Sequence, residues 1–253
     1  MSFSFFRLSS SGLSDIGLVR TNNEDVFLML KEQGFFALAD GMGGHNAGEV
    51  AAAEAMRFLS TSIEEFFVSS EKTWNIFELS SFNRLCIENV NSWVHYLGKK
   101  REAYQGMGTT LCTLLFYEHF LIYGHVGDSR IYLFRHGHLE QLTEDHSLRN
   151  QMAAQRYIGS GYLKRSVHKN VLTRAIGTQN EVDAEIHIAP VTHDDIYLMC
   201  TDGLTDQVSD REIEAILQDS NSLEHGSHAL IKRANGEGGQ DNVTVLMVKA
   251  ENE

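Results

Sequence analysis

Residues 111–142 read LCTLLFYEHFLIYGHVGDSRIYLFRHGHLEQL. Apolar, aromatic and β-branched residues form three runs in this stretch, at 111–117, 120–126 and 131–134, and short polar segments separate the runs. Runs of this length and composition are typical of β-strands, and connections this short are typical of hairpins. We therefore predict consecutive antiparallel hairpins between residues 108 and 142.

Further apolar runs and two long helical patterns extend this prediction over the rest of the chain. Apolar residues keep helical spacing over residues 51–66 and again over residues 86–97, which predicts two amphipathic helices. Asn46 is placed to cap the first helix, and Ser209 with Glu212 forms a capping pattern near the C-terminus. Hairpins combined with amphipathic helices favour an α+β fold in which helices cover sheets. The further predicted strands are Val26–Leu30, Gly34–Ala39, Ile196–Cys200 and Val243–Val248.

The composition limits the size and class of the protein. With 253 residues, of which 42% are hydrophobic, the chain can bury one substantial core, and we expect a single domain over residues 1–253. Its 34 acidic residues outnumber its 21 basic ones and give a net charge of -13. Such a charge repels polyanions, so we expect no nucleic-acid partner and regard cations as better partners.

The cysteines and the apolar runs indicate the cellular compartment. Cys86, Cys112 and Cys200 are odd in number and lie in apolar runs, which favours buried, reduced thiols over a disulfide framework. The N-terminus, MSFSFFRLSSSG, lacks the basic and apolar segments of a signal peptide. No apolar run approaches the roughly 20 residues that span a bilayer. We expect a cytoplasmic protein with no membrane partner.

Four aspartates adjoin predicted strands: Asp40, Asp128 and Asp202 follow apolar runs, and Asp241 precedes one. Each of the first three, taken alone, is explained as part of an ordinary turn. If the strands bring all four together, their mutual repulsion raises their pKa values unless cations neutralise them. Oxygen ligands suit Mg²⁺ or Mn²⁺, whereas zinc prefers His and Cys ligands, which are not grouped here.

Hard cations held in this way are suited to the hydrolysis of phosphate esters. Two of them about 3.5–4 Å apart activate a shared water and stabilise the oxygens of an in-line displacement. Such a site also requires a cation that orients the phosphate and an acid that protonates the leaving alkoxide. Arg20 and His45 are the candidates. Taken alone, Arg20 is an ordinary surface arginine and His45 an ordinary surface or helix-cap histidine.

Eight sequence blocks, in order along the chain, resemble those of the PPM family of metal-dependent protein phosphatases, also called type 2C. They cover nearly the whole chain, and their joint occurrence is far more specific than any single block. The blocks are SDIGLVRTNNED (14–25), ALADGMGGHNAGEVAA (37–52), GMGTTL (106–111), VGDSRIYL (126–133), LTEDHSL (142–148), LTRAIG (172–177), CTDGLTD (200–206) and GGQDNVTVL (238–246).

The resemblance implies a central antiparallel β-sandwich flanked by helix pairs, in four layers, with metals at one end of the sandwich. It implies that Asp40 bridges two Mn²⁺ or Mg²⁺ ions and that the carbonyl of Gly41 holds one of them. Asp202 and Asp241 complete the other site, and Glu24 acts through metal-bound water. In bacterial members the aspartates that match Asp128 and Asp202 hold a third, weaker metal.

The same resemblance assigns roles to the residues around the metals. Arg20 grips the substrate phosphate, where a guanidinium makes two parallel charge-assisted bonds. Asp25 orients the attacking water or, alternatively, fixes Arg20. His45 donates a proton to the leaving group, a task that its ordinary pKa of about 6.5 suits. Supporting roles around the site are expected for Thr109, Thr110, Asp145, His146, Thr173 and Arg174.

A basic segment lies where related enzymes have a variable flap, at about 147–170. It contains Arg149, Arg156, Lys164, Arg165 and Lys169 and no acidic residue. We expect this flap to attract phosphorylated segments and to gate the channel. The alternative is a solvated basic loop without a role in binding.

The expected function is metal-dependent hydrolysis of phosphoserine and phosphothreonine in proteins by a metal-activated water. The expected partners are phosphorylated proteins, the targets of a cognate bacterial Ser/Thr kinase. Two alternatives stay open: a two-metal phosphatase that acts on small-molecule phosphates, and an inactive module that binds phosphoproteins. The second would be favoured by loss of a metal aspartate, and none of Asp40, Asp202 or Asp241 is missing.

Overall fold

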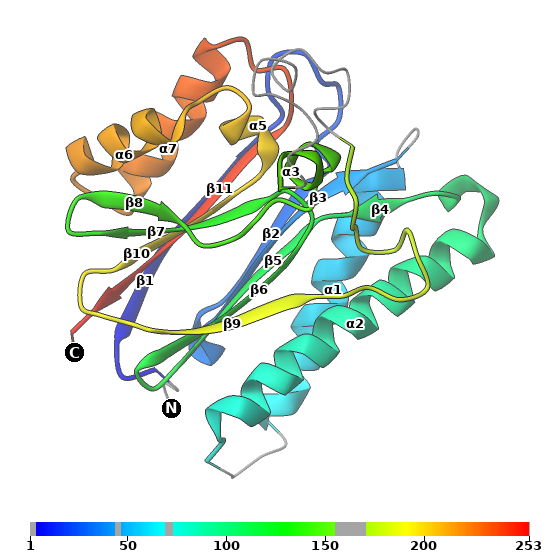
Figure 1. Cartoon of the computed structure of the whole chain (residues 1–253), viewed down its shortest axis with the longest axis horizontal. Helices are drawn as coiled ribbons and strands as arrows, with labels where there is room; N and C mark the ends of the chain where they lie inside the picture. Colours follow the sequence, from blue (N-terminus) through cyan, green and yellow to red (C-terminus); the bar gives the residue numbers. More distant parts are fainter. Residues whose placement is uncertain (1–3, 44–46, 69–72, 155–170, 253) are drawn as a thin grey trace.

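The computed structural model describes residues 4–43, 47–68, 73–154 and 171–252. In this part of the chain two antiparallel sheets pack face to face, and helices cover the outer face of each sheet (Figure 1). The strand order is β1-β11-β10-β7-β8 in one sheet and β2-β3-β5-β6-β9 in the other, with β4 paired to β3. The predicted α+β fold, a sandwich flanked by helices in four layers, is confirmed.

The elements follow one another from β1 near the N-terminus to β11 near the C-terminus. The strands are β1 (Arg7–Asp15), β2 (Asp25–Leu30), β3 (Phe35–Met42), β4 (Gly108–Thr109), β5 (Leu111–Tyr117), β6 (Phe120–Val126), β7 (Arg130–Arg135), β8 (His138–Gln141), β9 (Glu185–Pro190), β10 (Ile196–Cys200) and β11 (Val243–Glu251). The α-helices are α1 (Ala47–Val68), α2 (Ile76–Lys100), α3 (Leu148–Ala154), α5 (Asp202–Thr205), α6 (Asp210–Asp219) and α7 (Leu223–Gly236).

Strand β3 shows why the sandwich holds together. Phe35, Ala37 and Ala39 pack in a cluster with α1 and α2, whereas Phe36 and Leu38 pack in the cluster between the two sheets. Successive side chains of a strand point to opposite faces, so a strand buried on both faces must be apolar throughout. This is the origin of the unbroken apolar run in the sequence.

The helices begin where local capping predicts. Ser209 and Glu212 form a capping box at the start of α6, which confirms the sequence prediction. Asn75 and Glu78 form a second capping box at the start of α2, which the prediction from apolar spacing placed ten residues too late. The predicted cap Asn46 lies outside the described residues.

The predicted run of consecutive hairpins is wrong at one position. Strands β5 and β6 form a hairpin, and so do β7 and β8, but β6 pairs with β9 and β7 pairs with β10 in the other sheet. The chain changes sheets at Gly127, which has a φ of +111° and lies so close to Thr110 that a Cβ would be 2.7 Å from it. This crossing brings Asp128 to the end of the sandwich.

Strands β1 and β9 were not predicted from the sequence, because neither has an unbroken apolar run. Strand β1 is held in the sheet by antiparallel pairing with β11. The pairing extends from Arg7, which lies opposite Glu251, to Asp15, which lies opposite Val243. The three cysteines are buried and unpaired, as predicted. In the described ranges no helix is both long and apolar enough to cross a membrane.

Candidate metal centre

Asp40 stands at the end of β3 with its backbone held on both sides. Its N–H donates to the hydroxyl of Thr110 (2.9 Å), and its carbonyl accepts from the Thr110 N–H (2.8 Å) and the Thr109 hydroxyl (2.8 Å). Because the two threonines fix the backbone, they also fix the direction in which the carboxylate leaves the strand.

Asp25, at the start of β2, is the residue opposite Asp40 in the antiparallel pair. Its side chain is buried, and one carboxylate oxygen, Oδ2, accepts from the hydroxyls of Thr201 (3.0 Å) and Thr244 (2.7 Å). The other oxygen, Oδ1, is buried with no hydrogen-bond partner in the described structure. Asp25 is therefore oriented by the neighbouring sheet, with one oxygen left to accept a further bond.

Asp40 and the three other aspartates predicted as metal ligands line one cavity of about 270 Å³ at the end of the sandwich, and Asp25 is not among its lining residues. Asp128 reaches it from the turn after β6, Asp202 from the first residue of α5, and Asp241 from the residues before β11. Glu24 and Gly41 line the same cavity. The structure thus brings together carboxylates that lie up to 217 residues apart in the sequence, from Glu24 to Asp241.

The electrostatics of these carboxylates are unfavourable in the absence of a counter-charge. Burial raises the pKa of Asp40 well above its ordinary value, and the nearby Asp25, Asp202, Asp128 and Asp241 raise it further. Burial, followed by repulsion from Asp128 and Asp241, likewise raises the pKa of Asp202. Anionic forms of these groups are stable together only beside a bound cation.

Asp25 and Asp128 show the same effect. Burial raises the pKa of Asp25 to about 6, although the hydrogen bonds from Thr244 and Thr201 act in the opposite direction. Burial and the neighbouring Asp145 raise the pKa of Asp128 to about 6. Burial also raises the pKa of Glu24 above its ordinary value.

The donor set and the backbone around it fit a hard divalent cation. All the side-chain donors are carboxylates, and oxygen ligands are those that Mg²⁺ and Mn²⁺ prefer. The backbone of Gly41 approaches closely: a Cβ there would lie 2.2 Å from the Gly48 carbonyl oxygen. A Cβ on Gly48 would lie 2.8 Å from the backbone carbonyl carbon of Gly41, so glycine is required at both positions for this part of the cavity wall.

A second hollow, of about 160 Å³, is also lined by Asp128 and Asp202. Arg149 and Asp145 line it, and Asp145 forms a two-bonded ion pair with Arg130, at 2.8 and 2.7 Å. Asp128 and Asp202 therefore line two cavities.

Arg20 lines the same cavity. The alternative prediction that Asp25 fixes Arg20 is not met, because Arg20 bonds to Asp241 instead. One terminal nitrogen of its guanidinium donates to Oδ2 of Asp241 at 2.7 Å, and its side chain is half-exposed. Asp25 instead bonds to threonines. The arginine is thus held at the rim of the cavity by one of the predicted metal ligands.

His45 cannot be assessed in this way because residues 44–46 lie outside the described residues. The same holds for most of the predicted flap, residues 155–170, with Arg156, Lys164, Arg165 and Lys169. Of the basic residues proposed for the flap, Arg149 is described, and it is exposed beside Asp128 in the second hollow.

Asn242 is a site residue that the sequence reasoning passed over. Its side-chain amide donates to the carbonyls of Ile16 (3.0 Å) and Asn22 (2.8 Å), and its Oδ1 accepts from the N–H of Glu24 (2.9 Å). One side chain therefore ties down the loop that carries Arg20. The sequence could have indicated this role, because Asn242 directly follows Asp241 in the block GGQDNVTVL.

The layered sandwich, with a carboxylate cavity at its end, defines a metal-dependent phosphatase of the 2C type. The family described as Protein phosphatase 2C matches residues 9–243. The chain is 36% identical over 241 residues to the serine/threonine phosphatase stp of Listeria welshimeri, covering 93% of each chain. The chain belongs to the protein phosphatase 2C family.

Solved structures agree with this assignment. The Mycobacterium tuberculosis serine/threonine phosphatase PstP/Ppp has a TM-score of 0.86 and 34% identity, covering 96% of this chain and 99% of that one. The catalytic domain of PstP in complex with 2 manganese ions has a TM-score of 0.84 and 34% identity, covering 96% and 98%. The expected family, fold and activity, metal-dependent dephosphorylation of protein serine and threonine, are confirmed.

Proposed function

We propose that the carboxylate cavity is the catalytic centre and that Asp40, the carbonyl of Gly41, Asp202 and Asp241 hold two Mn²⁺ or Mg²⁺ ions there. Glu24 acts through a water ligand, and Asp128 with Asp202 holds a third ion. The convergence of buried, mutually repelling carboxylates on one cavity carries this proposal. The two manganese ions in the related PstP structure support the number of the principal sites.

The bound cations supply Lewis acidity toward phosphate oxygens and lower the pKa of a water molecule. Arg20 binds the phosphate of the substrate at the cavity rim; one of its guanidinium nitrogens bonds to Asp241, and a guanidinium has further N–H donors for phosphate oxygens. Asp25 orients the attacking water through its unpartnered Oδ1. His45 protonates the leaving serine or threonine oxygen.

The substrates we propose are phosphorylated proteins, in particular the targets of a cognate Ser/Thr kinase in the cytoplasm. The names of the relatives as serine/threonine phosphatases support this substrate class. One catalytic domain over residues 1–253, with a flap at about 147–170 that attracts phosphorylated segments, is part of the same proposal.

A substrate panel tests it. Phosphoserine, phosphothreonine and phosphotyrosine peptides, a nucleotide and a short oligonucleotide are each assayed for phosphate release with Mn²⁺, with Mg²⁺ and with chelator. We expect metal-dependent turnover of the phosphoserine and phosphothreonine peptides and loss of turnover in a folded Asp40→Asn variant. Preference for the nucleotide, or binding of phosphopeptide without release, would contradict the proposal.

A further inference from the structure

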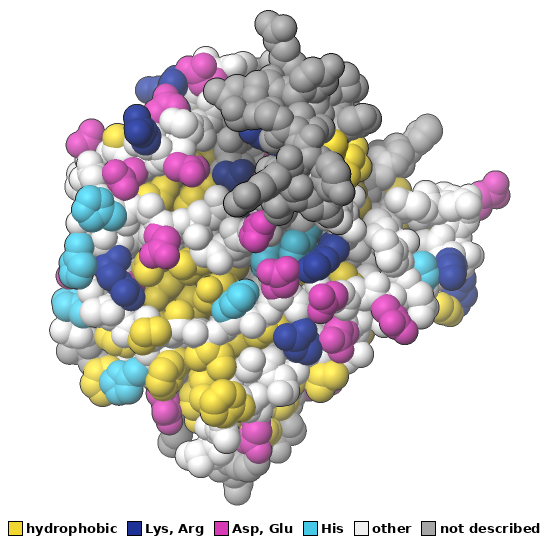
Figure 2. All heavy atoms as spheres, viewed as in Figure 1, with side chains coloured by type: hydrophobic (Ala, Val, Ile, Leu, Met, Phe, Trp, Pro, Cys, Tyr) yellow, Lys and Arg dark blue, Asp and Glu magenta, His cyan; other side chains and the backbone are white. Residues whose placement is uncertain are grey.

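Histidine side chains lie among acidic and basic ones on the face that Figure 2 shows. In one such group, His125, His146 and Glu185 each place a ring nitrogen or carboxylate oxygen within 4.8 Å of the other two. The group is not free to hold a cation, because Oε1 of Glu185 lies 3.0 Å from Nε2 of His146 and accepts from Arg174 at 2.8 Å. It is instead a hydrogen-bond network whose other end lies at the turn before Asp128.

His146 bonds to both polar backbone groups of Gly127. Its N–H donates to the Gly127 carbonyl (2.8 Å), and its side-chain Nδ1 accepts from the Gly127 N–H (3.2 Å). The chain crosses between the sheets at Gly127, and the carbonyl of this residue belongs to the same planar peptide unit as the nitrogen of Asp128. The two bonds therefore fix the backbone from which the carboxylate of Asp128 projects toward the two cavities that it lines.

The side-chain bond to Gly127 requires one tautomer of His146. A neutral imidazole has one N–H and one acceptor nitrogen, so an Nδ1 that accepts from Gly127 leaves the proton on Nε2. Glu185 is the acceptor for that proton. The opposite tautomer would let Nε2 accept from Arg174, 3.3 Å away, but it would place the Nδ1 hydrogen against the Gly127 N–H. The Nε2–H tautomer satisfies the two shorter of these three contacts.

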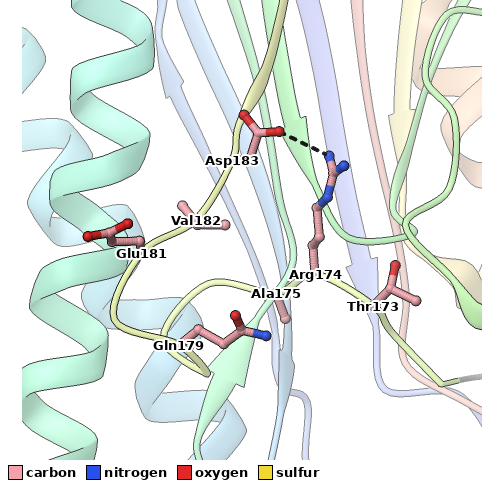
Figure 3. A pocket seen from close by; sticks show the side chains of 7 residues that line it. All are labelled: Thr173, Arg174, Ala175, Gln179, Glu181, Val182 and Asp183. Carbon is pink, nitrogen blue, oxygen red and sulfur yellow. Dashed lines mark ion pairs between the residues drawn. The ribbon is translucent and has the colours of Figure 1, made fainter.

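Charge and packing favour the same form of His146. Burial lowers the pKa of His146, although the bond to Glu185 acts in the opposite direction, so the ring is neutral near pH 7. Burial acts to raise the pKa of Glu185, but the bonds from His146 and Arg174 outweigh it and lower this pKa below its ordinary value. Arg174 reaches Glu185 from the loop that leads into β9, where it also lies 3.9 Å from Asp183 (Figure 3). His125 stacks on the ring of His146, with centroids 4.4 Å apart, which limits its rotation.

We propose that His146 is a positioning residue for Asp128. Glu185 and Arg174 hold the Nε2–H tautomer of His146, and its Nδ1 then holds the N–H of Gly127 and the turn that carries the aspartate. The proposal rests on the function proposed above, in which Asp128 is a ligand of the third ion, and adds the residues that keep this ligand in place. Loss of a residue that orients a metal ligand costs about 10- to 100-fold in metal affinity.

Two substitutions of His146 separate the roles of its two ring nitrogens. Asparagine places an acceptor oxygen near the position of Nδ1, whereas glutamine places its amide near that of Nε2. Calorimetry measures Mn²⁺ binding by the wild type, His146→Asn, His146→Gln and Asp128→Asn. We expect His146→Gln to weaken the weak Mn²⁺ site by about ten-fold and to leave the two tight sites unchanged. The weak site should be close to wild type in His146→Asn and absent in Asp128→Asn.

The control for a general loss of stability is Arg135→Ala, at the other end of β7. It leaves the buried Asp195 without its two-bonded partner (2.6 and 2.7 Å) and should keep the weak site. A weak site that is kept in His146→Gln and lost in Asp128→Asn, or lost equally in His146→Gln and Arg135→Ala, overturns this proposal alone. A weak site that is absent from the wild type or kept in Asp128→Asn contradicts the proposed third ion, and the positioning role with it.

The tautomer of His146 is a readout that a change in stability does not move. Nitrogen NMR of the Mg²⁺-loaded protein, labelled at its histidines, reports which ring nitrogen carries the proton. The signals of His146 are those missing from His146→Asn, and we expect a protonated Nε2 and an unprotonated Nδ1. The reverse pattern overturns the proposal.

Discussion

Asp25 and Asp40 lie directly opposite each other in the antiparallel pair of β2 and β3. Like charges at opposed positions of two strands are destabilising, and here burial adds to the cost because it raises the pKa of both carboxyl groups. The pair is therefore stable either with protons or with a cation nearby. This relationship is the physical basis of the predictions about metal and pH.

Replacing Asp40 with asparagine should separate stability from metal binding. In chelator, Asp40→Asn should melt at the same temperature as the wild type or higher, because one of the opposed charges is gone. Saturating Mn²⁺ should raise the melting temperature of the wild type by about 5–10 °C and that of the variant by much less. Thermal melts with and without Mn²⁺ check this, and equal shifts in the two proteins would show that Asp40 is not a ligand.

The pKa of Asp25 predicts a pH-dependent gain in stability for Asp25→Asn. The folded protein holds the proton of Asp25 up to about pH 6, whereas the unfolded chain loses it near 3.8. Its contribution to stability is thus full below pH 4 and is lost as the pH rises to 6. In chelator, the variant should become more stable than the wild type across this window, by up to about 3 kcal/mol.

Urea unfolding at a series of pH values from 4 to 8 measures that difference. Because the other titrating groups are present in both proteins, their contributions largely cancel in the comparison. A difference that does not change with pH would mean that the pKa of Asp25 is the same in the folded and unfolded protein.

Asn242→Ala should weaken the enzyme through the loop it holds. The variant leaves the N–H of Glu24 and the carbonyls of Ile16 and Asn22 without their partner, at a cost of about 1–3 kcal/mol. Because Arg20 lies on the same loop, we expect KM for an aryl phosphate to rise more than kcat falls. The exposed Asn221 provides the control substitution, Asn221→Ala. Unchanged KM and unchanged stability would refute this role.

His146 joins the turn before Asp128 to the strand after the flap. Its backbone and Nδ1 bond to Gly127 at 2.8 and 3.2 Å, its carbonyl accepts from Thr173, and its Nε2 lies 3.0 Å from Glu185. His146→Ala keeps the backbone bonds but leaves the Gly127 N–H without its acceptor and removes the contact with Glu185, so it should lower the free energy of unfolding by about 1–3 kcal/mol. The more exposed partner should matter less, so Glu185→Gln is expected to cost under about 1 kcal/mol. Denaturant titrations of the two variants measure which substitution lowers the free energy of unfolding more.

The sequence alone determined most of the helices and strands, though not β1 and β9, and the residue types that carry the chemistry of the site. Strands such as β5 and β6 were predicted to the residue, because a strand buried on both faces is apolar along most of its length. The aspartates were recognisable because each adjoins such a strand. The apolar runs and the aspartates beside them are local features, which a single sequence is enough to show.

Only the tertiary structure decided which strands pair and what each carboxylate faces. The apolar runs of β6 and β7 do not reveal that the two strands belong to different sheets, and the polar β1 joins its sheet only because β11 pairs with it. The ion pair of Arg20 with Asp241 and the three-bonded Asn242 link residues more than 200 positions apart. Such contacts depend on how distant segments are brought together in space, which periodicity and spacing do not record.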